Sequence, residues 1–350
     1  MSAEHDVPAG ARPALAGAQA RQRILELGSS VWAFSALAAA VEGGLLGELA
    51  TPQTSAQIST RTGTSAVLIE AVLDVLVGLD LVHSDGEAFV CAPGMSGYTS
   101  GQQHEILRAD LRATNLMATE LVARLRAGGA AAHGWRYQDP ALLEAQGVRS
   151  IEAVPILVER LFPALDGLCD ALHAPTASFL DVGTGVGRLA IAMCEQFPAL
   201  RVVGLDPFDT ALQLARRNVA EAGLADRIEL RPEPVQTLAD ESRYDLAWVP
   251  AHFLPADEAA RGLRRVRAAL RPGGWAVVGA VAAAGEGLQP AILRLVGLLF
   301  GSGRTSADDV AGMLRAAAYD RIQVLPAAPD VPIRMIVARR PASGSTELNP

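Results

Sequence analysis

The sequence predicts an α/β protein: a mostly parallel seven-stranded sheet wound on both faces by helices, preceded by a smaller helical unit of winged-helix type. Three observations support this. Strand-like and helix-like segments alternate from residue 177 to residue 340. The segment FLDVGTGVGRLA, residues 179–190, has the pattern of a buried strand, a glycine-rich turn and the start of a helix. Helix, helix, helix and hairpin follow one another between residues 14 and 100.

Composition narrows the possible classes of protein before any motif is considered. The chain has 350 residues, of which 50% are hydrophobic, so we expect two globular domains with large cores. A formal charge of −8 disfavours a nucleic-acid partner. No basic and apolar leader opens the chain, and the apolar run at residues 291–300 is too short to span a bilayer. We therefore expect a cytoplasmic protein without a membrane partner.

The first domain is predicted at residues 14–100. Residues 24–41 carry apolar side chains at helical spacing. A short helix is expected at residues 55–62, with Ser55 as its N-cap and Gly63 as its stop. An apolar helix at residues 65–79 precedes two short strands, 81–84 and 88–91, which flank an Asp-Gly turn. Residues 1–13 and 341–350 are expected to be disordered.

The apolar helix at residues 65–79 occupies the place of a recognition helix, but it contains Glu70 and Asp74 and neither Arg nor Lys. Because phosphate contact needs cationic side chains, a transcription regulator is disfavoured. Apolar residues surround most of this helix, which favours burial against a partner. Together with residues 31–40, it would expose too much apolar surface in a monomer, so we expect a homodimer through the first domain.

A helical segment at residues 101–175 is predicted to link the domains and to line a substrate pocket. Helices are expected at residues 104–125 and 151–172. Between them, the loop AHGWRYQDP carries His133, Trp135 and Tyr137, which are candidate pocket residues. The alternative is that the two large aromatic residues only pack between helices. His104 is a further candidate for the pocket.

The second domain is predicted at residues 176–340. Its expected strands are residues 179–182, 201–205, 228–231, 244–249, 275–281, 323–325 and 334–339. Its expected helices are residues 189–197, 211–222, 257–270 and 307–317. This alternation predicts an open, doubly wound sheet, and ligands of such sheets bind at the carboxyl ends of the strands.

Two features lie at that edge of the sheet and point to a nucleotide-type cofactor. Gly183, Gly185 and Gly187 follow the first strand at alternate positions and allow a ligand to approach the backbone. Asp206 ends the second strand, about twenty residues later, where a carboxylate can accept hydrogen bonds from ribose hydroxyls. The alternative for Asp206 is a helix N-cap or turn residue.

The acidic residue before the glycines favours one of two possible kinds of cofactor over the other. Residues 185–190 fit the dinucleotide pattern G-x-G-x-x-A, which leaves a dinucleotide-dependent oxidoreductase as an alternative. A pyrophosphate is disfavoured by a carboxylate as close as Asp181, whereas a sulfonium with an amino-acid ammonium is favoured.

The motif D-V-G-T-G-V-G, with Asp206 ending the next strand, resembles the class I methyltransferases that use S-adenosylmethionine. The segment LRRVRAALRPGGWAVV, residues 263–278, is similar to that family's helix, Arg-Pro-Gly-Gly turn and fifth strand. With its winged-helix unit in front, the chain over residues 14–340 resembles small-molecule O-methyltransferases that dimerise through that unit. The resemblance implies methyl transfer to the oxygen of a phenol, hydroxyl or enol of a secondary metabolite.

The resemblance also implies roles for individual residues. Asp181 and Gly183 would hold the methionine end of S-adenosylmethionine, Gly185 and Gly187 would allow close approach, and Asp206 would bind the ribose. Pro207 and Phe208 would flank the adenine, and Glu233 would meet its amine, although two prolines bracket Glu233 in a departure from the family's pattern.

His252 follows the strand YDLAWV and is the candidate general base, with Phe253 beside it as a candidate pocket residue. The alternative is that His252 only lines the pocket. The family's Trp and Asp after the histidine, and its Glu at the end of the fifth strand, are absent here. An N- or C-methyltransferase of similar fold, and a protein that binds the cofactor without methyl transfer, therefore remain alternatives. No His, Asp and Glu trio has metal-ligand spacing, so we expect no required metal.

Overall fold

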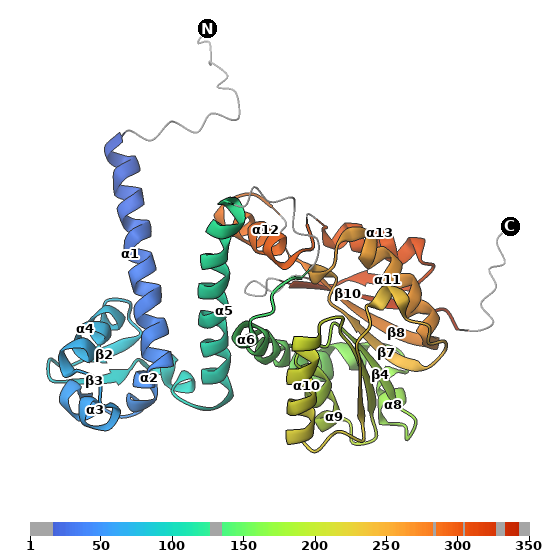
Figure 1. The fold of residues 1–350 in the computed structure, drawn as a ribbon, viewed down its shortest axis with the longest axis horizontal. Coiled ribbons are helices and arrows are strands. Elements are labelled where there is room, and N and C mark those ends of the chain that lie inside the picture. Colours follow the sequence, from blue (N-terminus) through green and yellow to red (C-terminus); the bar gives the residue numbers. More distant parts are fainter. Residues whose placement is uncertain (1–16, 127–134, 283–284, 304, 327–332, 343–350) are drawn as a thin grey trace, which may run out of the picture. The chain divides into compact units, whose positions relative to one another are not determined.

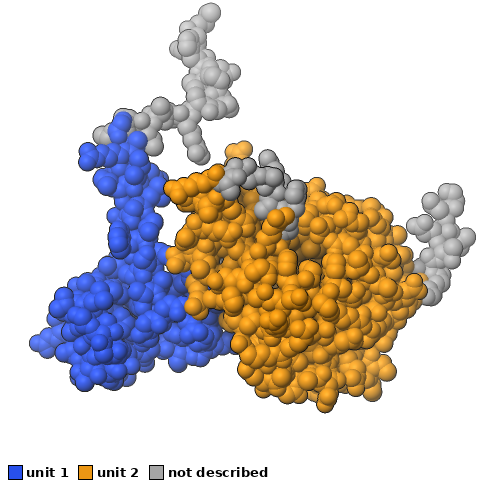
Figure 2. All heavy atoms as spheres, in the orientation of Figure 1, with its two compact units in different colours: residues 1–111 blue, residues 112–350 orange. Residues whose placement is uncertain are grey.

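The computed structural model describes residues 17–126, 135–282, 285–303, 305–326 and 333–342. The segment 1–13, most of 341–350 and the candidate His133 therefore lie outside the described residues. The chain forms two compact units, residues 1–111 and residues 112–350, which Figure 2 colours separately.

The first unit has the predicted order of helices followed by a hairpin (Figure 1). Its elements are α1 (Gly17–Glu42), α2 (Leu45–Glu48), β1 (Gln53–Thr54), α3 (Ser55–Thr62), α4 (Ala66–Val77), β2 (Val82–Ser84) and β3 (Ala88–Cys91). The three strands are antiparallel in the order β1-β3-β2. The predicted stop at Gly63 is confirmed by its φ of 71°. The predicted N-cap is wrong by one residue: the Thr54 hydroxyl, not that of Ser55, accepts a hydrogen bond from the Gln57 amide.

The apolar helix α4 is only partly buried within this unit. Ile69, Leu73 and Leu76 are in the core, whereas Val67 and Leu68 are 78% and 58% exposed. Helix α1 packs on α4 and also has an exposed apolar face, which consists of Ile24, Leu25, Leu27, Val31 and Trp32. By length and composition alone, residues 19–42 of α1 would suffice to cross a membrane.

The helical segment between the two predicted domains agrees with expectation in its first helix and differs in its second. The helix predicted at residues 104–125 is present as α5 (Gly101–Arg126), and the two compact units divide inside it, between residues 111 and 112. The helix predicted at residues 151–172 is broken because Pro163 lacks an amide hydrogen and Gly167 has a φ of 73°. The observed elements are α6 (Pro140–Ile151), α7 (Ala153–Ile156), a π-helical turn (Leu157–Leu161), a 3-10 turn (Phe162–Ala164) and α8 (Leu168–His173).

The predicted seven-stranded sheet is confirmed. Its strands are β4 (Ser178–Val182), β5 (Arg201–Leu205), β6 (Ile228–Arg231), β7 (Tyr244–Val249), β8 (Leu270–Val281), β9 (Asp320–Val324) and β10 (Ile333–Arg339). The order across the sheet is β6-β5-β4-β7-β8-β10-β9. The first five strands are parallel, and β10 is antiparallel to both of its neighbours.

Helices cover both faces of the sheet (Figure 1). Their bounds are α9 (Arg188–Gln196), α10 (Asp209–Glu221), α11 (Ala256–Ala269), α12 (Leu288–Phe300) and α13 (Ala307–Ala316). Neighbouring strand residues enter opposite cores, as the period of two requires. Phe179 packs in the core that contains α8 and α9, whereas Leu180 packs in the core that contains α11 and α13.

Strand β8 begins earlier than predicted and contains the Arg-Pro-Gly-Gly segment as an irregularity. Tyr244 pairs with Leu270 and Leu246 pairs with Trp275, so four residues of β8 are accommodated opposite one residue of β7. Gly273, at a φ of 85°, makes this bend possible.

A substitution at Leu180 tests the central core, since this side chain is fully buried in the middle of β4. We expect Leu180→Ala to lower the free energy of unfolding by about 2–5 kcal/mol, because a buried leucine leaves a cavity. Urea unfolding followed by circular dichroism measures this loss. The control Leu298→Ala, at a side chain that is 42% exposed, should cost less than about 1 kcal/mol. Equal losses in the two variants would contradict the assigned core.

Candidate functional site

The glycine-rich turn lies where the strand order reverses. The chain runs outward from β4 to β5 and β6 and then returns to the other side of β4 as β7. The carboxyl ends of β4, β5 and β7 therefore border one crevice, the ligand site of open α/β sheets. Gly183, Gly185 and Gly187 have φ values of 64°, 56° and 79°, a backbone that side-chain-bearing residues rarely adopt.

Two buried carboxylates hold this turn. Asp181, at the end of β4, accepts a hydrogen bond of 2.6 Å from the Thr184 hydroxyl. Asp206, directly after β5, accepts one of 2.9 Å from the Gly185 amide and one of 3.0 Å from the Phe208 amide. The hydrogen bond from the Phe208 amide gives Asp206 the turn role that the sequence analysis considered as an alternative. The N-cap position of α10 itself is occupied by Phe208. Carboxylate oxygens have further lone pairs, so this contact leaves capacity for a ligand.

Burial disfavours the ionised form of both carboxylates. Desolvation raises the pKa of Asp181 to about 7, opposed by the Thr184 hydrogen bond and reinforced by the charge of Asp206. Desolvation also raises the pKa of Asp206 to about 6, against its two backbone hydrogen bonds. Among the described residues, neither carboxylate has an ion pair with a cationic side chain. A cationic ligand would stabilise their ionised forms.

The segment after β7 forms the other side of the crevice. A Cβ atom on Gly183 would lie 3.2 Å from Cγ of Pro250, so the glycine turn and the end of β7 are in close contact. His252 follows two residues later in a 3-10 turn (Ala251–Phe253) and is 3% exposed. The chain thus brings the predicted base and the predicted cofactor turn to the same edge of the sheet.

His252 is fixed in one tautomer by the backbone of β8. Its Nδ1 lies 3.1 Å from the carbonyl oxygen of Gly279, which can only accept, so Nδ1 carries the hydrogen and Nε2 carries the lone pair. A Cβ on Gly279 would lie 3.0 Å from Nδ1, so only glycine allows this approach without displacement. Burial, aided by the charge of Arg149, lowers the pKa of His252 to about 4, so the imidazole is neutral at pH 7.

An aromatic cluster surrounds His252. The ring of Phe253 lies 4.2 Å from the imidazole and 4.9 Å from Trp135, and Phe300 at the end of α12 lies 5.1 Å from Phe253. Trp135 also contacts Tyr137, at 4.8 Å, and its amide donates to the Phe253 carbonyl. The sequence prediction named three members of this cluster, Trp135, Tyr137 and Phe253. It missed Phe300, although Phe300 lies in the apolar run at residues 291–300.

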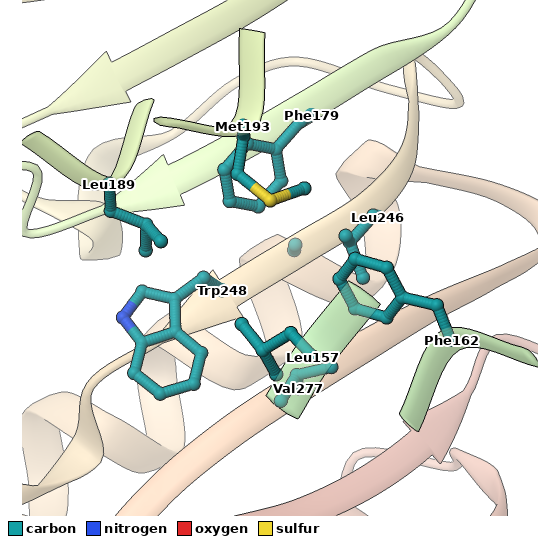
Figure 3. A pocket seen from close by; sticks show the side chains of 9 residues that line it. Leu157, Phe162, Phe179, Leu189, Met193, Leu246, Trp248 and Val277 are labelled. Carbon is teal, nitrogen blue, oxygen red and sulfur yellow. The ribbon is translucent and has the colours of Figure 1, made fainter. Parts of the chain in front are cut away.

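Two small cavities of about 10 Å³ each, room for a single water, lie in this unit. One adjoins His252 and Phe300 and is otherwise lined by aliphatic residues of α12, β8 and β10. The other lies among apolar side chains of α9, β4 and β7, including Phe179, Met193 and Leu246 (Figure 3). This second cavity is a packing void between sheet and helices, because no ionisable side chain lines it.

The remaining candidates have partners within the protein. The Glu233 carboxylate follows β6 and lies 3.6 Å from the Arg231 guanidinium. Phe208 packs against the cluster of Leu143, Val186 and Ala211 near the glycine turn. His104, in the first unit, contacts the carbonyl of Tyr98 at 2.9 Å.

Part of the chain is similar in sequence to known methyltransferases. Residues 179–274 match the family model described as a methyltransferase domain. Over 188 residues, the chain is 37% identical to release factor glutamine methyltransferase of Cereibacter sphaeroides, covering 52% of this chain and 66% of that protein. The chain spans 25% and 38% of the lengths of two further curated methyltransferases. It is also 28% identical over 278 residues to N,N-dimethyltransferase OxyT of Streptomyces rimosus, covering 75% and 78%.

Solved structures share the fold along nearly the whole chain. Human N-acetylserotonin methyltransferase in complex with S-adenosylmethionine has a TM-score of 0.65 at 18% identity, covering 93% of this chain and 98% of that one. The mitomycin 7-O-methyltransferase MmcR has a TM-score of 0.63 at 20% identity, covering 92% and 98%. At these identities, the likeness establishes the fold.

The sheet order, the glycine turn and the two acidic strand ends define a nucleotide-cofactor domain of the methyltransferase class. With the match at residues 179–274, the second unit contains a methyltransferase domain, and the chain resembles the class I methyltransferases that use S-adenosylmethionine. The sequence-based resemblance and fold class are confirmed.

Asp181 predicts a measurable pH dependence of stability. Because the native carboxyl has a pKa of about 7 against an ordinary 3.8, the native state binds more protons in that interval, and the free energy of unfolding falls as pH rises. Asp181→Asn removes this contribution, so its stability should fall less than that of the wild type between about pH 5 and pH 7.5. Urea unfolding at both pH values measures it.

A matched control is Asp257→Asn, at a carboxylate that is 68% exposed on α11. This control should keep the pH dependence of the wild type. If Asp181→Asn does the same, the buried carboxyl does not hold its proton as described.

Proposed function

We propose that this protein transfers the methyl group of S-adenosylmethionine to an oxygen atom of a small molecule, such as a phenol or enol of a secondary metabolite. The observation that carries the proposal is the neutral His252, whose Nδ1 is bonded to the Gly279 carbonyl and whose Nε2 keeps its lone pair. His252 follows two residues after Pro250, which lies against the glycine turn. The family match supports methyl transfer, and the fold of the solved O-methyltransferases supports a small acceptor.

The residues of the crevice fit the proposed cofactor. Asp181 and Asp206 are buried and, within the part of the chain that the structure describes, have no cationic partner, which suits a ligand with a sulfonium and an ammonium group. Asp181 and Gly183 would hold its methionine end, Gly185 and Gly187 would allow close approach, and Asp206 would bind the ribose hydroxyls. Pro207, Phe208 and Glu233 would contact the adenine. When bound, S-adenosylmethionine supplies an electrophilic methyl group.

His252 would act by accepting the hydroxyl proton of the acceptor at Nε2. A carbonyl partner orients the imidazole, but it stabilises the imidazolium less than a carboxylate would. Since the pKa of His252 is lowered to about 4, the residue is a weak base. An acidic hydroxyl, such as that of a phenol or enol, therefore suits it better than an aliphatic alcohol.

The aromatic cluster would provide the apolar wall of the acceptor site. Trp135, Phe253 and Phe300 are in mutual contact around the imidazole, and flat apolar side chains favour a planar acceptor. The net charge of −8 is consistent with a small-molecule acceptor rather than a nucleic acid.

Methyl transfer to nitrogen is the second candidate. It is favoured by the similarity to OxyT, which extends over 75% of this chain and whose name gives N,N-dimethyl transfer. An acceptor screen with phenols, enols and amines, in which formation of S-adenosylhomocysteine is measured, separates the candidates. Turnover with amines alone would favour nitrogen, and cofactor binding without turnover on any acceptor would favour a binding protein.

His252→Ala tests the base. We expect its turnover to fall by about 10²-fold or more while the affinity for S-adenosylhomocysteine is unchanged, because only proton removal is lost. Gly279→Ala should also slow turnover, since its Cβ displaces the imidazole from the β8 carbonyl. Steady-state kinetics and calorimetric titration measure the two effects. Turnover near that of the wild type in His252→Ala would assign His252 to the pocket lining.

We further propose that the protein is a homodimer formed through the first unit. The exposed apolar faces of α1 and α4, with Trp32 at 77% and Val67 at 78% exposed, support this proposal. Covering such faces removes apolar surface from water without requiring a membrane.

Trp32→Glu tests the dimer. We expect its dissociation constant to rise at least about tenfold, because an aromatic contact is replaced by a charge. Sedimentation velocity over a concentration series measures it. The control Leu288→Glu, at a 76% exposed residue of α12, should leave the wild-type dimer intact. A monomeric wild type, or one that associates only with lipid vesicles, would contradict the proposal.

A further inference from the structure

Helix α6 lies unusually close to the glycine-rich turn. A Cβ atom on Gly147 of α6 would lie 2.2 Å from Cγ2 of Val186 and 3.0 Å from Cγ of Arg188. Real Cβ atoms do not approach other atoms at 2.2 Å, so α6 is seated directly on the turn. The contact also includes Leu143, which packs with Val186 and Ala211. Figure 1 shows α6 beside α9 and α10 within the second unit.

Val186 stands between Gly185 and Gly187, which both have positive φ. Its side chain is 1% exposed, and its carbonyl oxygen accepts a hydrogen bond of 3.0 Å from Nδ2 of Asn218 on α10. Without this donor, a buried peptide oxygen of the turn would lose its side-chain partner, at a free-energy cost. Asn218 itself is 2% exposed, so the bond is shielded from water.

Glu144 of α6 orients this amide. Its Oε1 accepts from Nδ2 of Asn218 at 3.2 Å and from Arg217 at 3.1 Å, and its Oε2 accepts from Arg188 at 3.2 Å. The two groups next to Nδ2, the Val186 carbonyl and the Glu144 carboxylate, are both acceptors. If the amide were turned over, Oδ1 would face these two oxygens without a hydrogen between them. In the described part of the chain, Oδ1 of Asn218 has no hydrogen-bond partner. The contacts of Asn218 therefore depend on its donor, Nδ2, and not on its acceptor, Oδ1.

We propose that Asn218 and Glu144 are positioning residues for cofactor binding, which hold the Val186 carbonyl and thereby fix the left-handed backbone of the glycine turn. The inference rests on the proposed function, because the ligand of the turn is S-adenosylmethionine. Neither side chain needs to touch that ligand. Their action runs through the peptide between Gly185 and Gly187, so a change at Asn218 alters affinity for the cofactor rather than only the stability of the fold.

Asn218→Asp is the decisive variant, because it keeps the shape and replaces the donor by a carboxylate. The new charge faces the Val186 carbonyl and the Glu144 carboxylate. We expect the dissociation constant for S-adenosylhomocysteine at pH 8, measured by calorimetry, to rise at least about tenfold, or 1.4 kcal/mol. Burial and the facing Glu144 carboxylate raise the pKa of the new carboxyl, so lowering the pH toward about 5.5 favours its protonated form, which has a donor. The ratio of variant to wild-type dissociation constants should therefore shrink as the pH falls.

Two further variants separate positioning from stability. Glu144→Gln combined with Asn218→Asp removes one of the facing charges and should recover part of the affinity. Asp245→Asn is the matched control, since Asp245 is a largely buried carboxylate that also accepts two hydrogen bonds, from the Ser178 amide and Arg271, at the opposite edge of the sheet. It should lower the melting temperature and leave the affinity for S-adenosylhomocysteine unchanged.

The outcomes distinguish this inference from the proposed function. A wild type that does not bind S-adenosylhomocysteine would overturn both. A wild type that binds, with Asn218→Asp binding equally well at pH 8, would overturn the positioning role alone. If Asn218→Asp does not fold, Glu144→Gln decides, since its side chain is 26% exposed and the change keeps its shape. That variant should bind about threefold more weakly, and unchanged affinity would overturn the inference.

Discussion

The close approach of the β4–α9 turn to its neighbours is the constraint on which the site depends. Because β4 is central and its neighbours β5 and β7 run parallel to it, three strand ends meet at one edge. The chain can turn there into α9 only through backbone of positive φ, which places glycine at 183, 185 and 187. Two carboxylates, the end of β7 and helix α6 all pack against that turn, so its conformation determines theirs.

The crevice divides into two electrostatic halves. On the side of β4 and β5, burial raises the pKa values of Asp181 and Asp206, and a cation there would be stabilised by their ionisation. On the side of β7, burial keeps His252 uncharged among aromatic rings. The same physical cause, removal from water, thus prepares one half for a charged ligand and the other for a neutral, planar one.

Local patterns in the sequence predicted the sheet, the glycine turn and both acidic strand ends, because each depends on residues adjacent in the chain. The failures have equally specific causes. The helix expected at residues 151–172 is interrupted at Pro163 and Gly167, and β8 starts before its Arg-Pro-Gly-Gly bend because pairing with β7 extends it. Glu144 and Asn218 were not predicted, since 74 residues separate them in sequence and no motif marks either one. The functional roles of the site residues stay predictions.

Gly147 has a consequence for any attempt to stabilise this protein by helix propensity. A glycine inside a helix costs about 1 kcal/mol relative to alanine, so α6 would be an obvious target for replacement. At this position, however, a single methyl group would collide with Val186 in the turn. The weakest helix former in the interior of α6 is thus the residue that lets the helix approach the turn, and a gain in helicity would be obtained at the expense of the site.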